Sequence, residues 1–122
     1  MYSFKEVTLQ RSGIEKKRLV IQFEDENMEI IAQFLMTEVG NDGMTYIDGI
    51  VSVERGETPL FEGTGNLFAW HVTKEKSVIE DVYYDAEEQI GYEPIELKTS
   101  DLKEFITVWT NKYEAWKKGT SI

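Results

Sequence analysis

The stretch from residue 101 to residue 119, DLKEFITVWTNKYEAWKKG, decides the fold class. Its large apolar side chains recur every three or four residues, which is the period of a helix with one buried face. They are Leu102, Phe105, Ile106, Trp109, Tyr113 and Trp116. Ser100 or Asp101 is expected to cap the first turn, and Gly119 to end the helix. A helix with this aromatic stripe must lie on an apolar sheet face.

Alternating apolar and polar residues upstream of this helix predict antiparallel strands. Ser12–Gly13 reads as the turn between the first two strands, and the charged residues TKEK, 73–76, as the turn of a second hairpin. The predicted strands cover residues 3–11, 17–24, 67–72 and 77–84, with a short strand at 94–97. We therefore expect an α+β fold: an antiparallel β-sheet meander with the C-terminal amphipathic helix and one further helix packed on one face.

Two segments allow both a helix and a strand. In residues 28–39, MEIIAQFLMTEV, we favour a strand, because Ile30 and Phe34 would fall outside the apolar stripe of a helix and stay exposed. Residues 44–55 have helical spacing, with Asn41 or Asp42 as the N-cap and Gly56 as the stop; the rival interpretation is a strand. Residues 57–66 are expected to form a loop, and the whole chain, 1–122, a single domain.

The composition excludes several classes of site. The chain has no cysteine, so disulfides and thiolate metal sites are absent, and His71 is its only histidine. The segment FEGTGN, 61–66, lacks the lysine of a phosphate-binding loop, and Gly63 or Gly65 is expected to have positive φ. We expect no catalytic residues, no metal and no cofactor. No apolar run approaches the ~18 residues of a membrane span, and the N-terminus lacks an apolar signal segment, which favours a cytoplasmic protein.

The charge of −10 is unevenly distributed along the sequence. Residues 1–20 carry five basic and two acidic side chains, and residues 102–122 carry four and two. Residues 21–101 carry four basic and nineteen acidic side chains, a net charge of −15. Such a surface repels phosphate backbones, which argues against nucleic-acid binding, and it attracts a basic protein.

The predicted second hairpin and the loop after it supply the candidate partner-binding surface. Aromatic side chains anchor protein interfaces, and a charged rim steers the encounter. The candidate residues are Glu80, Asp81, Tyr83, Tyr84, Asp85, Glu87, Glu88 and Tyr92. Alternatively, the same carboxylates lie on solvent-exposed loops and bind no partner.

The order of elements and the segments 61–66, 78–83 and 99–102 resemble the small acidic immunity proteins encoded beside bacterial polymorphic toxins, of the contact-dependent or LXG type. The resemblance covers residues 28–118. It implies a protein without an active site that binds one cognate toxin domain, often a basic nuclease, and blocks its cleft. It implies no particular binding residues, since these interfaces diverge with their toxins.

Two other functions stay open from the sequence. A small-ligand-binding or enzymatic domain would use a pocket between the sheet and the C-terminal helix, and a pocket containing His71 and a carboxylate would support it. A homodimer would use exposed aromatic side chains of the last helix, so the chain is expected to be a monomer or a dimer.

Overall fold

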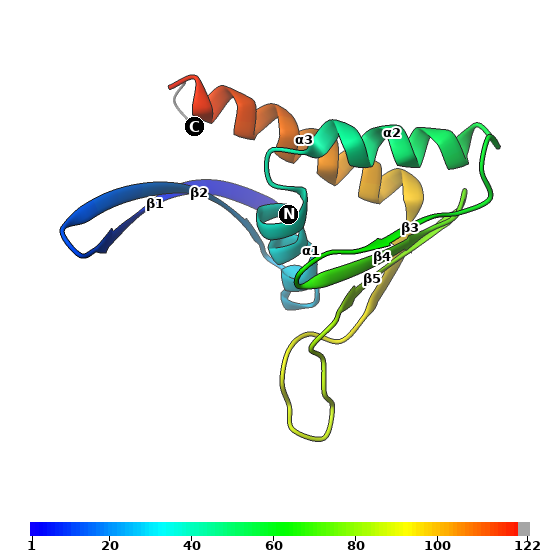
Figure 1. The fold of residues 1–122 in the computed structure, drawn as a ribbon, viewed down its shortest axis with the longest axis horizontal. Coiled ribbons are helices and arrows are strands. Elements are labelled where there is room, and N and C mark those ends of the chain that lie inside the picture. The colour runs from blue at the N-terminus through cyan, green and yellow to red at the C-terminus, as the bar shows by residue number, and fades with distance from the viewer. Residues whose placement is uncertain (120–122) are drawn as a thin grey trace.

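The computed structural model describes residues 1–119, which form two antiparallel sheets and three α-helices (Figure 1). The first sheet contains β1 (Tyr2–Arg11) and β2 (Ile14–Phe23). The second is a four-stranded meander of β3 (Phe61–Thr64), β4 (Phe68–Val72), β5 (Lys76–Asp81) and β6 (Ile95–Lys98). The helices are α1 (Glu29–Phe34), α2 (Gly43–Glu54) and α3 (Thr99–Lys117). The α+β class predicted from the sequence is confirmed.

The first hairpin is separate from the meander, whereas the sequence suggested one continuous sheet. It extends away from the other elements in Figure 1, and Ser12 and Gly13 form its turn with positive φ angles of 54° and 78°. Near its base, Leu19, Ile21 and Phe23 are buried on one face. From Leu19 toward the turn, the side chains on both strands are mostly exposed, so only the base of the hairpin belongs to the core.

The predicted strand at residues 28–39 is wrong: the segment is helical. It contains α1 and the π-helical turn η2 (Leu35–Val39), preceded by the short 3-10 turn η1 (Glu26–Met28). The strand was favoured because a helix seemed to leave Ile30 and Phe34 exposed, yet both are buried. The reason is that α1 packs against both β2 and β5, and a helix enclosed on several sides buries more than one stripe.

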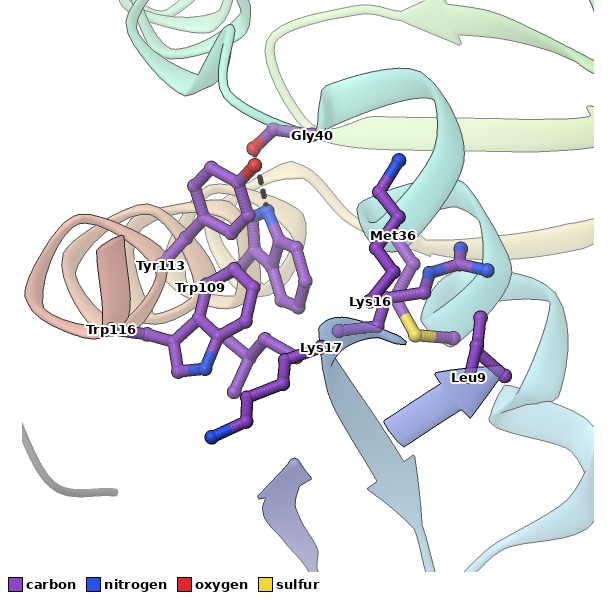
Figure 2. Close-up of a pocket in the computed structure, with 10 residues that line it drawn as sticks. Leu9, Lys16, Lys17, Met36, Gly40, Trp109, Tyr113 and Trp116 are labelled. Atoms are coloured by element: carbon purple, nitrogen blue, oxygen red, sulfur yellow. Dashed lines mark hydrogen bonds between the residues drawn. The ribbon is translucent and has the colours of Figure 1, made fainter. Parts of the chain in front are cut away.

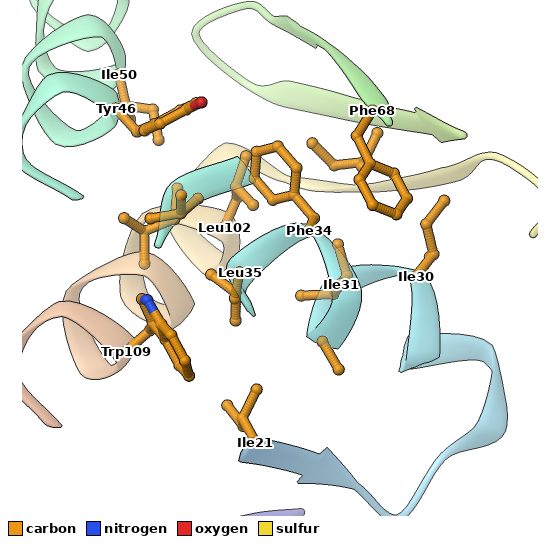
Figure 3. Packing of buried hydrophobic residues seen from close by; sticks show 14 of the residues in the cluster. Ile21, Ile30, Ile31, Phe34, Leu35, Tyr46, Ile50, Phe68, Leu102 and Trp109 are labelled. Carbon is orange, nitrogen blue, oxygen red and sulfur yellow. The ribbon is translucent and has the colours of Figure 1, made fainter. Parts of the chain in front are cut away.

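Buried side chains from these elements meet in one core (Figure 3). Phe34 of α1 lies edge-on to the rings of Tyr46 and Phe68, with centroid distances of 5.8 and 6.2 Å. Trp109 of α3 is fully buried, and its indole N–H donates to the carbonyl of Gly40 at 2.8 Å. This hydrogen bond ties the middle of α3 to the end of η2.

The helix predicted at 44–55 is confirmed as α2, and Gly56 ends it with a φ of 75°. Asp42 occupies the predicted cap position, but its carboxylate accepts from the hydroxyl of Thr45 at 3.3 Å rather than from a backbone N–H. Gly49 is needed for packing, since a Cβ there would lie 2.5 Å from the ring of Phe61. The helix therefore lies directly on β3.

The segment 57–66 was expected to be a loop, but four of its residues form β3. The expected positive φ at Gly63 or Gly65 is also wrong, since neither residue is among those with positive φ. Both glycines instead allow close contacts. A Cβ on Gly63 would collide with the Trp70 ring, and one on Gly65 with the Glu38 carboxylate.

The C-terminal helix begins at Thr99, one or two residues before the predicted caps Ser100 and Asp101. Lys98 occupies the cap position without a side-chain hydrogen bond. The buried Thr99 hydroxyl donates to the carbonyl of Thr73 at 2.7 Å and lies 2.8 Å from the Ser77 hydroxyl. Contacts with the β4–β5 hairpin thus fix the start of α3 where a conventional cap was expected.

Candidate functional site

The candidate residues lie mainly on the loop between β5 and β6, residues 82–94, which we call the acidic loop. β5 ends at Asp81, so Tyr83 and Tyr84 lie in the loop and not in the predicted strand. The loop projects beyond the end of the four-stranded sheet, away from α2 and α3 (Figure 1). Asp85, Glu87 and Glu88 are exposed on it. The structure thus brings the three carboxylates together on one projecting segment.

Asp81 organises the base of the acidic loop. One of its carboxylate oxygens accepts from the backbone N–H of Tyr83 at 2.9 Å, and the other accepts from that of Tyr92 at 3.0 Å. Gly91 lies so close to this carboxylate that a Cβ there would collide with it. Asp81 therefore holds together the two ends of the loop, because both of its oxygens are engaged within the chain.

Asp85 shapes the tip of the loop. Its backbone pairs with that of Ile90 through two hydrogen bonds of 2.9 and 3.0 Å. Its carboxylate accepts from the N–H groups of Glu87 and Glu88 at 3.0 and 3.2 Å. The two glutamate side chains are consequently held on a short closed turn, which limits the conformational entropy that a binding partner must remove.

Tyr84 and Tyr92 are the half-buried tyrosines of the acidic loop. Burial raises the pKa of Tyr84, and the nearby Glu93 and Asp85 raise it further; its hydroxyl donates to the Glu93 carboxylate at 3.5 Å. Burial also raises the pKa of Tyr92, with contributions from Glu29 and Asp81. Both phenols therefore remain protonated donors well above neutral pH. Tyr92 packs partly against the core, which leaves Tyr83 as the exposed aromatic of the set.

An apolar cluster accompanies the carboxylates, and the sequence analysis did not single it out. Tyr83 is 64% exposed, Ile90 54%, and Val82 and Leu67 42% each. The backbone N–H of Val82 donates to the carbonyl of Leu67 at 3.0 Å, which links the cluster to the β3–β4 turn. The detectable signal was Ile90, an apolar residue inside the charged loop, since Leu67, Val82 and Tyr83 fell within predicted strands.

Glu80 lies apart from the loop, on the outer face of the four-stranded sheet. Strand alternation places it on the same face as Glu62, His71 and Glu96, opposite to the buried Ile79. His71 Nδ1 is 3.0 Å from a carboxylate oxygen of Glu62, and its Nε2 is 3.9 Å from one of Glu80. Lys76 and Lys98 share this face with the glutamates, so it carries charges of both signs, and only the strand register could have identified the grouping.

His71 points away from the space between the sheet and α3, which is filled by buried side chains such as Ile79 and Ile106. Among residues 1–119 no group of three or more acidic or histidine side chains could hold a metal ion. No helix within those residues is both long and apolar enough to cross a lipid bilayer.

Comparison with known proteins adds no relative. No protein-family profile matches the chain, and neither a curated protein nor a solved structure matches it.

Proposed function

We propose that this chain is a non-catalytic, cytoplasmic immunity protein, which neutralises a cognate bacterial toxin by occluding its active cleft. The observation that carries the proposal is the acidic loop, which exposes the carboxylates of Asp85, Glu87 and Glu88 together with the apolar side chains of Tyr83 and Ile90. An exposed apolar cluster with a charged rim is typical of protein-binding surfaces. A basic, nuclease-like toxin is the partner whose charge complements it.

Charge and shape support this role together. The acidic loop projects from the molecule (Figure 1), so its exposed carboxylates can enter a concave site that is lined with cations for binding nucleic acid. Complementary fields raise the rate of association, and the apolar side chains then provide burial.

The proposal predicts that a toxin domain is encoded beside this gene; the test uses that domain, with its active site inactivated, and measures binding by calorimetry. We expect a 1:1 complex that the triple variant Asp85→Lys/Glu87→Lys/Glu88→Lys weakens by about 100-fold or more, since like charges would then face a basic cleft. A matched control, Asp48→Lys/Glu104→Lys/Glu114→Lys, changes the net charge equally on exposed positions of α2 and α3.

Equal weakening by both triple variants would show that only the overall charge matters and would contradict a role for the loop. Tyr83→Ala provides a test without a charge change, and we expect it to weaken binding by about 10-fold if its ring is an anchor.

A further inference from the structure

A groove separates the first hairpin from the C-terminal half of α3 (Figure 2). Its volume is about 360 Å³. Four consecutive residues of β2, Lys16–Leu19, line one side, and Tyr113 and Trp116 of α3 line the other. Leu9 of β1, Met36, Gly40 and the buried Trp109 complete the lining. We call this feature the β2 groove.

The β2 groove borders the unpaired side of β2 and also reaches one face of the hairpin, because Leu9 of β1, the register partner of Lys16, lines it too. Successive side chains of a strand point to opposite faces, so the four consecutive residues Lys16–Leu19 place part of the groove beside the strand. Within residues 1–119, β2 pairs only with β1, so its other edge carries backbone N–H and C=O groups without strand partners. An edge of this kind is a template for another strand.

The cations of the groove are poorly neutralised. Lys17 lies 3.9 Å from the Glu6 carboxylate, which also accepts from the Trp116 indole N–H at 2.7 Å. Lys16 and Arg18 have no carboxylate within 4.0 Å in the part of the chain that the structure describes. The groove therefore combines an unpaired strand edge, excess positive charge and an aromatic wall.

We propose that the β2 groove binds an extended acidic peptide segment of a partner protein, which adds to β2 as a third strand. The backbone of the segment pairs with the strand edge, and its carboxylates meet Lys16 and Arg18. An apolar side chain at an alternate position lies against Tyr113 and Trp116. A second copy of this chain is a poor occupant, because β2 paired with β2 would bring cations close to cations. The site is separate from the acidic loop and does not depend on the proposed function.

The probe is a fluorescein-labelled nonapeptide of alternating Glu and Val with a central Phe, titrated at low salt and followed by anisotropy. We expect saturable binding to the natural chain that Lys16→Glu/Arg18→Glu weakens by about 10-fold or more. The control Lys74→Glu/Lys98→Glu changes exposed cations on the other sheet and should leave the affinity nearly unchanged. Circular dichroism confirms that each variant is folded.

Strand addition is tested on the natural chain with two backbone-methylated peptides. Methylation of alternate amides on one edge of the peptide removes the pairing donors, whereas methylation of the other set leaves them intact. We expect only one of the two peptides to lose binding. Equal binding of both would overturn strand addition, and absence of any binding by the unmodified peptide would overturn the site. Tighter binding of oligo-dT or of phosphatidylserine vesicles, with the same loss in Lys16→Glu/Arg18→Glu, would overturn the acidic peptide as occupant.

Discussion

Gly43 and Gly49 allow other elements to touch the surface of α2. A Cβ on Gly43 would collide with the Thr110 side chain of α3, and one on Gly49 would lie 2.5 Å from the Phe61 ring of β3. An alanine in an open helix is about 1 kcal/mol more favourable than a glycine. The direction of a glycine-to-alanine effect therefore reports whether these contacts exist.

We expect Gly49→Ala to lower the free energy of unfolding by about 1–3 kcal/mol, because the added methyl group overpacks the contact with Phe61. Urea denaturation measures the change. In a Phe61→Leu background, which removes the ring, the same substitution should be neutral or stabilising. Stabilisation by Gly49→Ala in the natural background would show that Gly49 of α2 does not lie against the Phe61 ring of β3.

The phenol of Tyr46 makes the free energy of unfolding depend on pH in the alkaline range. Burial raises the pKa of its phenol to about 12, and Glu38 and Asp42 contribute to the rise. The unfolded phenol ionises near 10, so the folded state holds its proton over a range in which the unfolded state loses it. The associated stability is complete below about pH 10 and is lost as the pH rises toward 12.

We therefore expect the free energy of unfolding to fall between about pH 10 and 12, and Tyr46→Phe to reduce the slope of that fall. Urea denaturation at a series of pH values measures both. Tyr83→Phe is the control, because Tyr83 is an exposed phenol. An unchanged slope in Tyr46→Phe would contradict the burial of this phenol.

Glu38 links η2 to the β3–β4 turn. One of its carboxylate oxygens accepts from the backbone N–H groups of both Leu67 and Phe68, at 2.7 and 3.0 Å. The other lies over Gly65, where no side chain could fit. A single carboxylate thus joins two elements about thirty residues apart in the sequence, next to the acidic loop.

Removing this carboxylate should loosen the turn. We expect Glu38→Ala to cost about 1–3 kcal/mol, because two backbone donors lose their acceptor, whereas Glu38→Gln retains an acceptor oxygen and costs less. Hydrogen exchange should show faster exchange of the Leu67 and Phe68 amides in Glu38→Ala. Glu114→Ala, at an exposed position of α3, is the control. Unchanged protection of both amides would contradict the link.

The sequence predicted elements best where one face of an element is buried. The stripe from Leu102 to Trp116 predicted α3, and the hairpin pattern around the turn at 73–76 predicted a strand at 67–72, where the structure has β4. It failed at residues 28–39, because the burial of Ile30 and Phe34 depends on elements distant in sequence that surround α1. The short strand β3 was missed for a related reason. Gly63 in the strand and Gly65 just after it allow contacts with Trp70 and Glu38, which a local sequence pattern cannot reveal.

The chain as a whole separates its charges. The two basic ends of the sequence meet, since Phe4 stacks on Trp109 with 6.4 Å between ring centroids and Lys112 lies 5.7 Å from the Phe4 ring. The acidic middle of the sequence contains the four-stranded sheet and the acidic loop, which project elsewhere (Figure 1). The sequence revealed this imbalance, but only the fold shows that the basic ends form one region beside the β2 groove.

The candidate site was predicted in part. The sequence located the acidic loop and the exposed Tyr83, because charge runs and turn residues are local features. It could not distinguish Asp81, whose oxygens are engaged by the backbone of Tyr83 and Tyr92, from carboxylates that are free to meet a partner. It also missed Glu62 and Glu96, because strand register decides that they lie on the same sheet face as Glu80.

The most direct test of the account is the association rate constant with the inactivated toxin domain, measured by stopped flow at increasing ionic strength. If the acidic loop guides binding, the rate of the natural chain falls steeply with salt, and Asp85→Lys/Glu87→Lys/Glu88→Lys flattens that dependence. The control variant Asp48→Lys/Glu104→Lys/Glu114→Lys should keep most of the salt dependence. The same salt dependence in all three proteins would contradict a partner-binding role for the acidic loop.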